Sequence, residues 1–231
     1  MKKKKPIETN LVSVDKFRKK SFQSLLLNQK DNIITGSLFN FNFIKHKILA
    51  NEIKNYDYDI IKNEILILDN LFNNFPTNLN ENNVINNYIS EILIQLLGFE
   101  KNNIYGQIRL NEKGKKNLIP DFLFSCVKFT KDKKFTDFEK SNIPMVMECK
   151  NNDIKIEFDN ENGPMQQLQS YLMHRNWAFK IGILTNGYEW IICMKNRPLS
   201  QSFLKFNLKK IYKERDIEKK IIYLLLFKIF F

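Results

Sequence analysis

Two acidic residues and a lysine stand at the ends of short apolar runs, and their types suit metal-assisted phosphate chemistry. Asp121 follows a proline and opens the run DFLF, Glu148 closes the run PMVME, and Lys150 follows two residues later. Both runs have the length and composition of strands. A carboxylate buried in such a run is costly unless it is paired or binds a cation. The three residues therefore predict a site for a divalent metal ion and a phosphate group.

The acid-x-lysine triplet alone has little specificity in a lysine-rich chain. It also occurs at Glu52/Lys54, Asp132/Lys134, Asp153/Lys155 and Glu218/Lys220. Only Glu148/Lys150 closes an apolar run and follows a Pro-Asp strand at hairpin distance, and Asp153/Lys155 is its main competitor. The structural alternative is that Asp121 forms a turn after proline and that Glu148/Lys150 is a surface ion pair.

Helices and strands that would position these residues follow from the apolar periodicity. Helical spacing occurs in residues 58–72, 81–99 and 165–175, and residues 206–231 are also expected to be helical. Strands are predicted for residues 104–110, 118–124, 144–150, 179–185 and 188–194, the last two joined by the hairpin signal Asn186-Gly187. This order predicts an α/β fold, a sheet covered by helices. We expect a helical N-terminal extension (1–77), a core (78–198) and a helical C-terminal extension (199–231).

Composition limits the partners. The 231-residue chain carries a formal net charge of +12, which favours nucleic acid, an anionic membrane or an acidic partner. The alternative is that an AT-rich genome encodes many lysines. Three cysteines without zinc-ligand spacing predict reduced thiols and a cytoplasmic protein. The apolar run 221–231 is too short to cross a bilayer, so no membrane is expected. It stops without a polar tail, as a fragment of a longer protein would.

The ordered motifs resemble a known family. Pro120-Asp121 is followed by Glu148-Cys149-Lys150, then by QQLQSY at residues 166–171, and then by ILTNGYEW at residues 183–190. Leu-Gly-Phe at residues 97–99 precedes them at the end of a predicted helix. This set resembles the PD-(D/E)xK nuclease domain of restriction enzymes. It is most similar to the N-terminal nuclease domain of type I restriction subunits and of the related type IIG fused restriction–methylation enzymes, over about residues 78–195.

The resemblance implies a restriction-endonuclease-like core, a mixed sheet flanked by helices, that cleaves double-stranded DNA with Mg²⁺. Asp121 and Glu148 would be the metal ligands and Lys150 the catalytic lysine. A helix glutamate often assists in this family. The match here is Glu81 or Glu91, and the position at the start of the helix favours Glu81.

Further residues match elements of the family that surround the site. Gln167 and Tyr171 match a Gln-xxx-Tyr element and would support the site or contact DNA; the alternative is an ordinary amphipathic helix. Lys115 and Lys116 lie in a basic loop that would grip phosphates, and the alternative is that they are solvated loop lysines.

The methyltransferase and ATPase motifs of complete restriction enzymes are missing from the sequence. We therefore expect a restriction module that works with a methyltransferase or translocase domain or subunit. Two alternatives from other classes remain. One is a non-cleaving nucleic-acid-binding module on the same fold, and the other is an interaction domain without a nucleic-acid role. The acid pair beside a lysine argues against the binding module, because binding alone does not require it.

Overall fold

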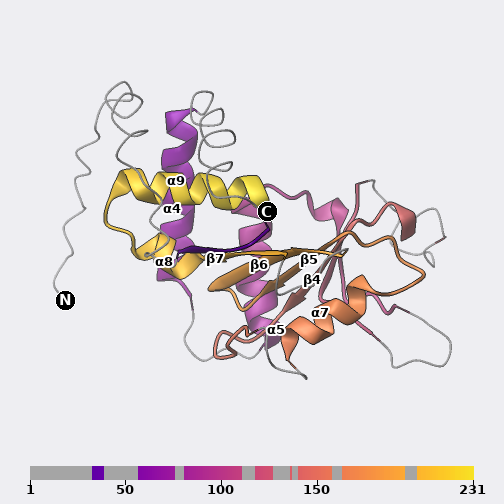
Figure 1. Ribbon diagram of the computed structural model, residues 1–231. Coiled ribbons are helices and arrows are strands. Elements are labelled where there is room, and N and C mark those ends of the chain that lie inside the picture. Colours follow the sequence, from indigo (N-terminus) through magenta and orange to yellow (C-terminus); the bar gives the residue numbers. More distant parts are fainter. Residues whose placement is uncertain are drawn as a thin grey trace.

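A seven-stranded mixed sheet forms the centre of the molecule in this computed structural model (Figure 1). The structure describes residues 33–38, 57–75, 81–110, 118–126, 136, 140–157, 163–195 and 202–231. The strand order is β1-β7-β6-β5-β4-β3-β2. The strands are β1 (Ile34–Gly36), β2 (Ile104–Gly106), β3 (Phe122–Phe124), β4 (Met145–Cys149), β5 (Ile181–Thr185), β6 (Glu189–Met194) and β7 (Phe203–Asn207).

One neighbouring pair of these strands is parallel, and this pair sets the position of a helix. β4 and β5 are parallel, whereas the other described neighbours are antiparallel. Parallel neighbours need a crossover connection. The chain between them contains α7 (Pro164–Leu172), which begins with a proline in its first turn, where the missing N–H costs nothing.

Helices cover both faces of the sheet. One apolar core cluster holds residues of α4 (Tyr58–Asn73), of the helical segment that begins with α5 (Glu81–Val84), of α8 (Leu208–Lys213) and of α9 (Ile217–Phe230). A second cluster lies on the opposite face and contains α7. Figure 1 shows α4 and α9 on one side of the sheet and α7 on the other. No helix in the described part of the chain is both long and apolar enough to cross a membrane.

The predicted helix over residues 81–99 is present but is wound more widely than an α-helix. After α5 the chain forms two π-helical turns, η3 (Ile85–Ile89) and η4 (Ile92–Leu96). The predicted apolar face is buried from Val84 to Leu96, and Leu97 at its end is partly buried. Gly98, at φ +75°, ends the segment as expected, and the Phe99 N–H closes the last turn on the Leu93 carbonyl at 2.9 Å.

The prediction of an α/β fold is confirmed, with corrections at individual elements. The helix predicted over 58–72 and the hairpin at Asn186-Gly187 are found, and the helix predicted over 165–175 is found as α7, which ends at Leu172. Strands β1 and β7 were not predicted, and they extend the sheet into both segments expected to be helical. The strand predicted over 104–110 ends at Gly106, because the next residue, Gln107, has φ +51° and leaves the sheet. The strand predicted over 118–124 is reduced to β3.

Candidate active site

Glu148 lies in β4, and Asp121 immediately precedes β3, the antiparallel neighbour of β4. The last register pair toward this end of the sheet is Phe122↔Met147, so Asp121 continues the register opposite Glu148. Side chains alternate between the faces of a strand, so both acids share a face. The backbone N–H of Cys149 donates to Oδ2 of Asp121 at 2.7 Å. The structure therefore brings together the two acids that the sequence singled out.

Glu148 is buried, and the lysine that pairs with it is partly buried. The side chain of Glu148 is 3% exposed and that of Lys150 is 16% exposed, and the Lys150 ammonium donates to Oε1 of Glu148. The structural alternative of a surface ion pair is therefore wrong for Glu148 and Lys150. The other oxygen, Oε2, is also buried and accepts no hydrogen bond from a described residue. The Tyr171 hydroxyl is near enough to favour the charged carboxylate, but it donates to the Ile119 carbonyl at 3.2 Å.

Burial raises the pKa of both carboxyl groups. The pKa of Asp121 is raised to about 6, mainly by burial and further by the charge of Glu81, against the opposing effects of a backbone hydrogen bond and Lys150. The pKa of Glu148 is raised to about 7 by burial and then by the charge of Asp121. Burial lowers the pKa of Lys150, but the neighbouring carboxylates outweigh this and raise it overall. When ionised, Asp121 and Glu148 together carry more negative charge than the one ammonium compensates.

The two candidate helix glutamates occupy different surroundings. Glu81 is the first residue of α5, and its charge raises the pKa of both Asp121 and Lys150. Glu91 lies further along the helical segment, where Oε2 accepts a hydrogen bond from the Gln95 amide. Glu81 therefore lies near the acid pair. Its assistance in catalysis stays a prediction, which this position favours over the same role for Glu91.

Gln167 and Tyr171 connect α7 to the strand that carries Asp121. The Gln167 amide donates to the Tyr171 hydroxyl at 2.7 Å, and that hydroxyl donates to the carbonyl of Ile119. Tyr171 is buried, whereas Gln167 is partly exposed. These two hydrogen bonds hold the backbone just before Pro120 and Asp121. Gln167 and Tyr171 of α7 therefore help to position Asp121.

Removing the Tyr171 hydroxyl should therefore loosen the site without destroying it. We expect Tyr171→Phe to lower the free energy of unfolding by about 1 kcal/mol, because it deletes two hydrogen bonds at a buried position. If the site cleaves phosphodiesters, we also expect a several-fold loss in kcat. Denaturant unfolding and cleavage kinetics measure the two effects. Ser170→Ala, at an exposed position on the same helix, is the control, and an equal loss in both variants would contradict the role of Tyr171.

The turn at residues 185–187 holds the chain segment that follows the catalytic lysine candidate. The carbonyl of Thr185 accepts from the N–H of Lys150 at 2.8 Å, and the Asn186 amide donates to the Ile154 carbonyl at 2.8 Å. Asn186 Oδ1 also accepts the N–H groups of Tyr188 and Glu189. The sequence predicted a hairpin here, but it did not predict that the hairpin asparagine binds the segment that follows Lys150 through the Ile154 carbonyl. No sequence signal separates these two uses of Asn-Gly.

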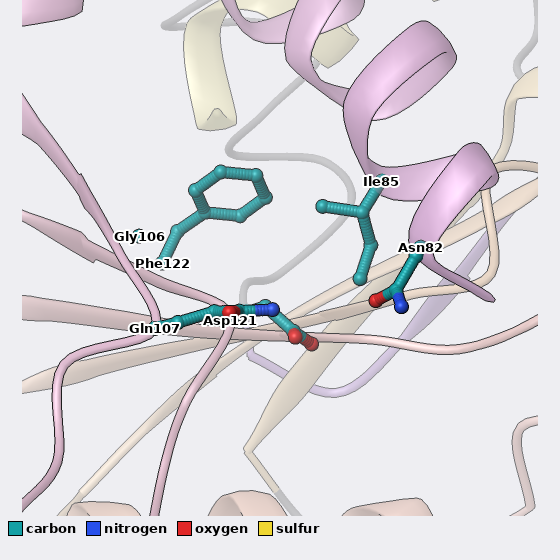
Figure 2. Close-up of a pocket in the computed structure, with 6 residues that line it drawn as sticks. All are labelled: Asn82, Ile85, Gly106, Gln107, Asp121 and Phe122. Carbon is teal, nitrogen blue, oxygen red and sulfur yellow. The ribbon is translucent and has the colours of Figure 1, made fainter.

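A pocket of about 420 Å³ opens beside Asp121. It is lined by Asn82, Ile85, Gly106, Gln107, Asp121 and Phe122. Figure 2 shows the side chains of Gln107 and Asp121 extending from the sheet toward Asn82 on the helix. Asn82 and Gln107 were not predicted as site residues. The pocket gives a ligand of several atoms access to the first carboxylate.

The number of possible metal ligands and the predicted DNA contacts complete the description of the site. Among the described residues there is no group of three or more His, Cys, Asp or Glu side chains placed to share a metal ion. The acid pair is therefore a site of two carboxylates, and Glu81 lies near it without joining it. Lys115 and Lys116, predicted to contact DNA, lie outside the described residues.

Comparison with known proteins gives no family assignment. No family model matches the chain, and no match was found among curated proteins or among solved structures.

Proposed function

We propose that this protein is a Mg²⁺-dependent endonuclease that hydrolyses phosphodiester bonds of double-stranded DNA. The observation that carries the proposal is the arrangement of buried Glu148 with partly buried Asp121 and Lys150 at one end of β3 and β4. A buried acid pair with one ammonium has little value for stability alone, because desolvation of the charges opposes it. It suits a site that binds a cation and a phosphate group.

The donor atoms fit a magnesium ion. Mg²⁺ prefers oxygen ligands and keeps several waters, so one or two carboxylates suffice to hold it. Oε2 of Glu148 is buried without a hydrogen bond from a described residue. Asp121 accepts the Cys149 N–H with Oδ2, and its other oxygen accepts no hydrogen bond from the described part of the chain. When bound, the ion would activate water and stabilise charge on the phosphate oxygens.

Lys150 would supply positive charge rather than act as a base. Its pKa is raised overall by the neighbouring carboxylates, so the ammonium is protonated at neutral pH. A protonated lysine can neutralise charge that develops on the phosphate during in-line attack. Its pairing with Oε1 of Glu148 fixes the position of the ammonium before substrate binds.

The proposal also covers the biological setting. The nuclease would be the restriction module of a restriction–modification system, acting with a methyltransferase or translocase domain or subunit. The net charge of +12 supports a DNA substrate. The three cysteines are free thiols, which supports a reducing compartment, the cytoplasm.

Plasmid nicking by the purified chain tests the proposal. We expect relaxation of supercoiled plasmid in Mg²⁺ and none in EDTA, and we expect the Asp121→Ala variant to lose it. Nicking that survives Asp121→Ala would place the activity elsewhere or in a contaminant. Tight, salt-sensitive DNA binding without nicking, even with a partner subunit added, would favour the alternative of a non-cleaving nucleic-acid-binding module.

A further inference from the structure

We propose that the Gln107 side chain is a substrate-binding residue that contacts the nucleotide beside the phosphate at Asp121. The inference rests on the proposed nuclease function and deepens it. Gln107 and Asp121 line the same pocket, together with Asn82 from α5. A strand that brings a phosphate to the Asp121 carboxylate would therefore also reach the Gln107 amide.

The backbone of Gln107 is held in an unfavourable conformation. Its φ is +51°, and it is the one residue other than glycine with a positive φ in the described part of the chain. This left-handed region is disfavoured for residues that carry a Cβ, and glycine or asparagine usually occupies it. Residues held in such conformations cluster at functional sites, where the surrounding structure enforces them.

A backbone hydrogen bond to Asp121, one of the two proposed metal ligands, holds Gln107 in this conformation. The N–H of Gln107 donates to the carbonyl of Asp121 at 3.0 Å, one step beyond the last β2–β3 pair, Gly106↔Phe122. The backbone therefore explains where residue 107 lies, but it does not explain why the residue is glutamine. A glycine would make the same hydrogen bond without strain.

The Gln107 side chain is free to bind a ligand. The residue is exposed, and its amide makes no hydrogen bond to another described residue. Figure 2 shows it extending in the same direction as the Asp121 carboxylate, toward Asn82. A side-chain amide offers a donor and an acceptor together, so it can form paired hydrogen bonds with a base edge that presents the complementary groups. We assign it a contact with the nucleotide rather than with the metal, because an amide is a weaker magnesium ligand than a carboxylate.

Three substitutions of Gln107 distinguish the effect of backbone strain on stability from the effect of the side-chain amide on binding. Gln107→Gly relieves the strain and removes the amide, Gln107→Ala keeps the strain and removes the amide, and Gln107→Asn keeps a shorter amide. We expect Gln107→Gly to raise Tm by about 2–4 °C. We expect both it and Gln107→Ala to weaken binding about 3- to 10-fold, as for the loss of a hydrogen bond. Gln169→Ala, an exposed glutamine of α7, should leave Tm and binding unchanged.

Binding is measured as the Kd of the full chain for a short fluorescein-labelled duplex in EDTA, and as KM for plasmid nicking in Mg²⁺. A more stable Gln107→Gly variant with weaker binding supports the assignment. A Gln107→Gly variant with wild-type Kd and KM overturns it, and the nuclease function still stands if Asp121→Ala abolishes nicking. Wild-type protein that binds no duplex overturns both. A Tm of Gln107→Gly at or below the wild-type value would show that residue 107 is not strained, and would contradict the assignment.

Discussion

The Glu148→Gln variant should lose DNA cleavage by at least about 100-fold while remaining folded. Glutamine has the shape of glutamate and can still accept a hydrogen bond from the Lys150 ammonium. It cannot supply the charge that a divalent cation requires. Because Oε2 of Glu148 is buried and accepts no hydrogen bond from a described residue, the loss would reflect the missing charge rather than a broken protein contact.

A matched control comes from the competing triplet of the sequence. Asp153 and Lys155 have the same spacing as Glu148 and Lys150, but both lie exposed in the segment after β4. We expect Asp153→Asn to cleave supercoiled plasmid at the wild-type rate. Single-turnover nicking in Mg²⁺ measures both variants. Loss of cleavage in Asp153→Asn, with activity retained in Glu148→Gln, would move the site to the other triplet.

The metal-free protein should become less stable as pH rises from 5 to 8. Burial raises the pKa of Glu148 to about 7 and that of Asp121 to about 6, above their ordinary values. A carboxyl group whose pKa is higher in the folded state binds its proton more tightly there than in the unfolded chain. Stability is therefore highest below the ordinary pKa and falls as pH rises through the folded-state pKa, by roughly 3 kcal/mol for Glu148.

Urea unfolding at pH 5 and pH 8 in EDTA measures this loss. Asp121→Asn should show a smaller loss, because it removes one ionisation and also the charge that raises the pKa of Glu148. Adding Mg²⁺ at pH 8 should raise the stability of the wild type, because the ion binds the ionised carboxylates of the folded state. Stability that is equal at both pH values in the wild type, or an equal gain from Mg²⁺ in Asp121→Asn, would contradict the coupled acid pair.

The sequence predicted the parts of the fold that rest on local periodicity. The helix at residues 58–72, the helical segment from Glu81 and the Asn186-Gly187 hairpin follow from apolar spacing and turn chemistry, and the structure contains them. The pairing of the strands next to Asp121 and Glu148 was also predicted, because the run that Glu148 closes follows the Pro-Asp strand at hairpin distance. In the structure, Asp121 lies opposite Glu148 when the register of β3 and β4 is continued by one residue.

The parts that were not predicted depend on contacts distant in the sequence. β1 has only three residues, and its Ile34 pairs with Phe206 of β7, a pairing between distant segments that no local pattern reveals. The left-handed turn at Gln107 is fixed by a hydrogen bond to Asp121, and glutamine gives no signal for such a turn. The role of Asn186 depends in the same way on the carbonyl of Ile154, across the end of the sheet.

The order of strands in the sheet has a consequence for how the chain is assembled. The strands β2 to β6, which hold the proposed site, are consecutive in the sequence, so a growing chain can pair them as they emerge. Among the strands that the structure describes, β1 is made first, yet its neighbour in the sheet is β7, which is made last. Closing so long a loop is slow. β1 must therefore wait until β7 has been made and has paired with β6, and until then β6 presents an unpaired edge to other nascent chains.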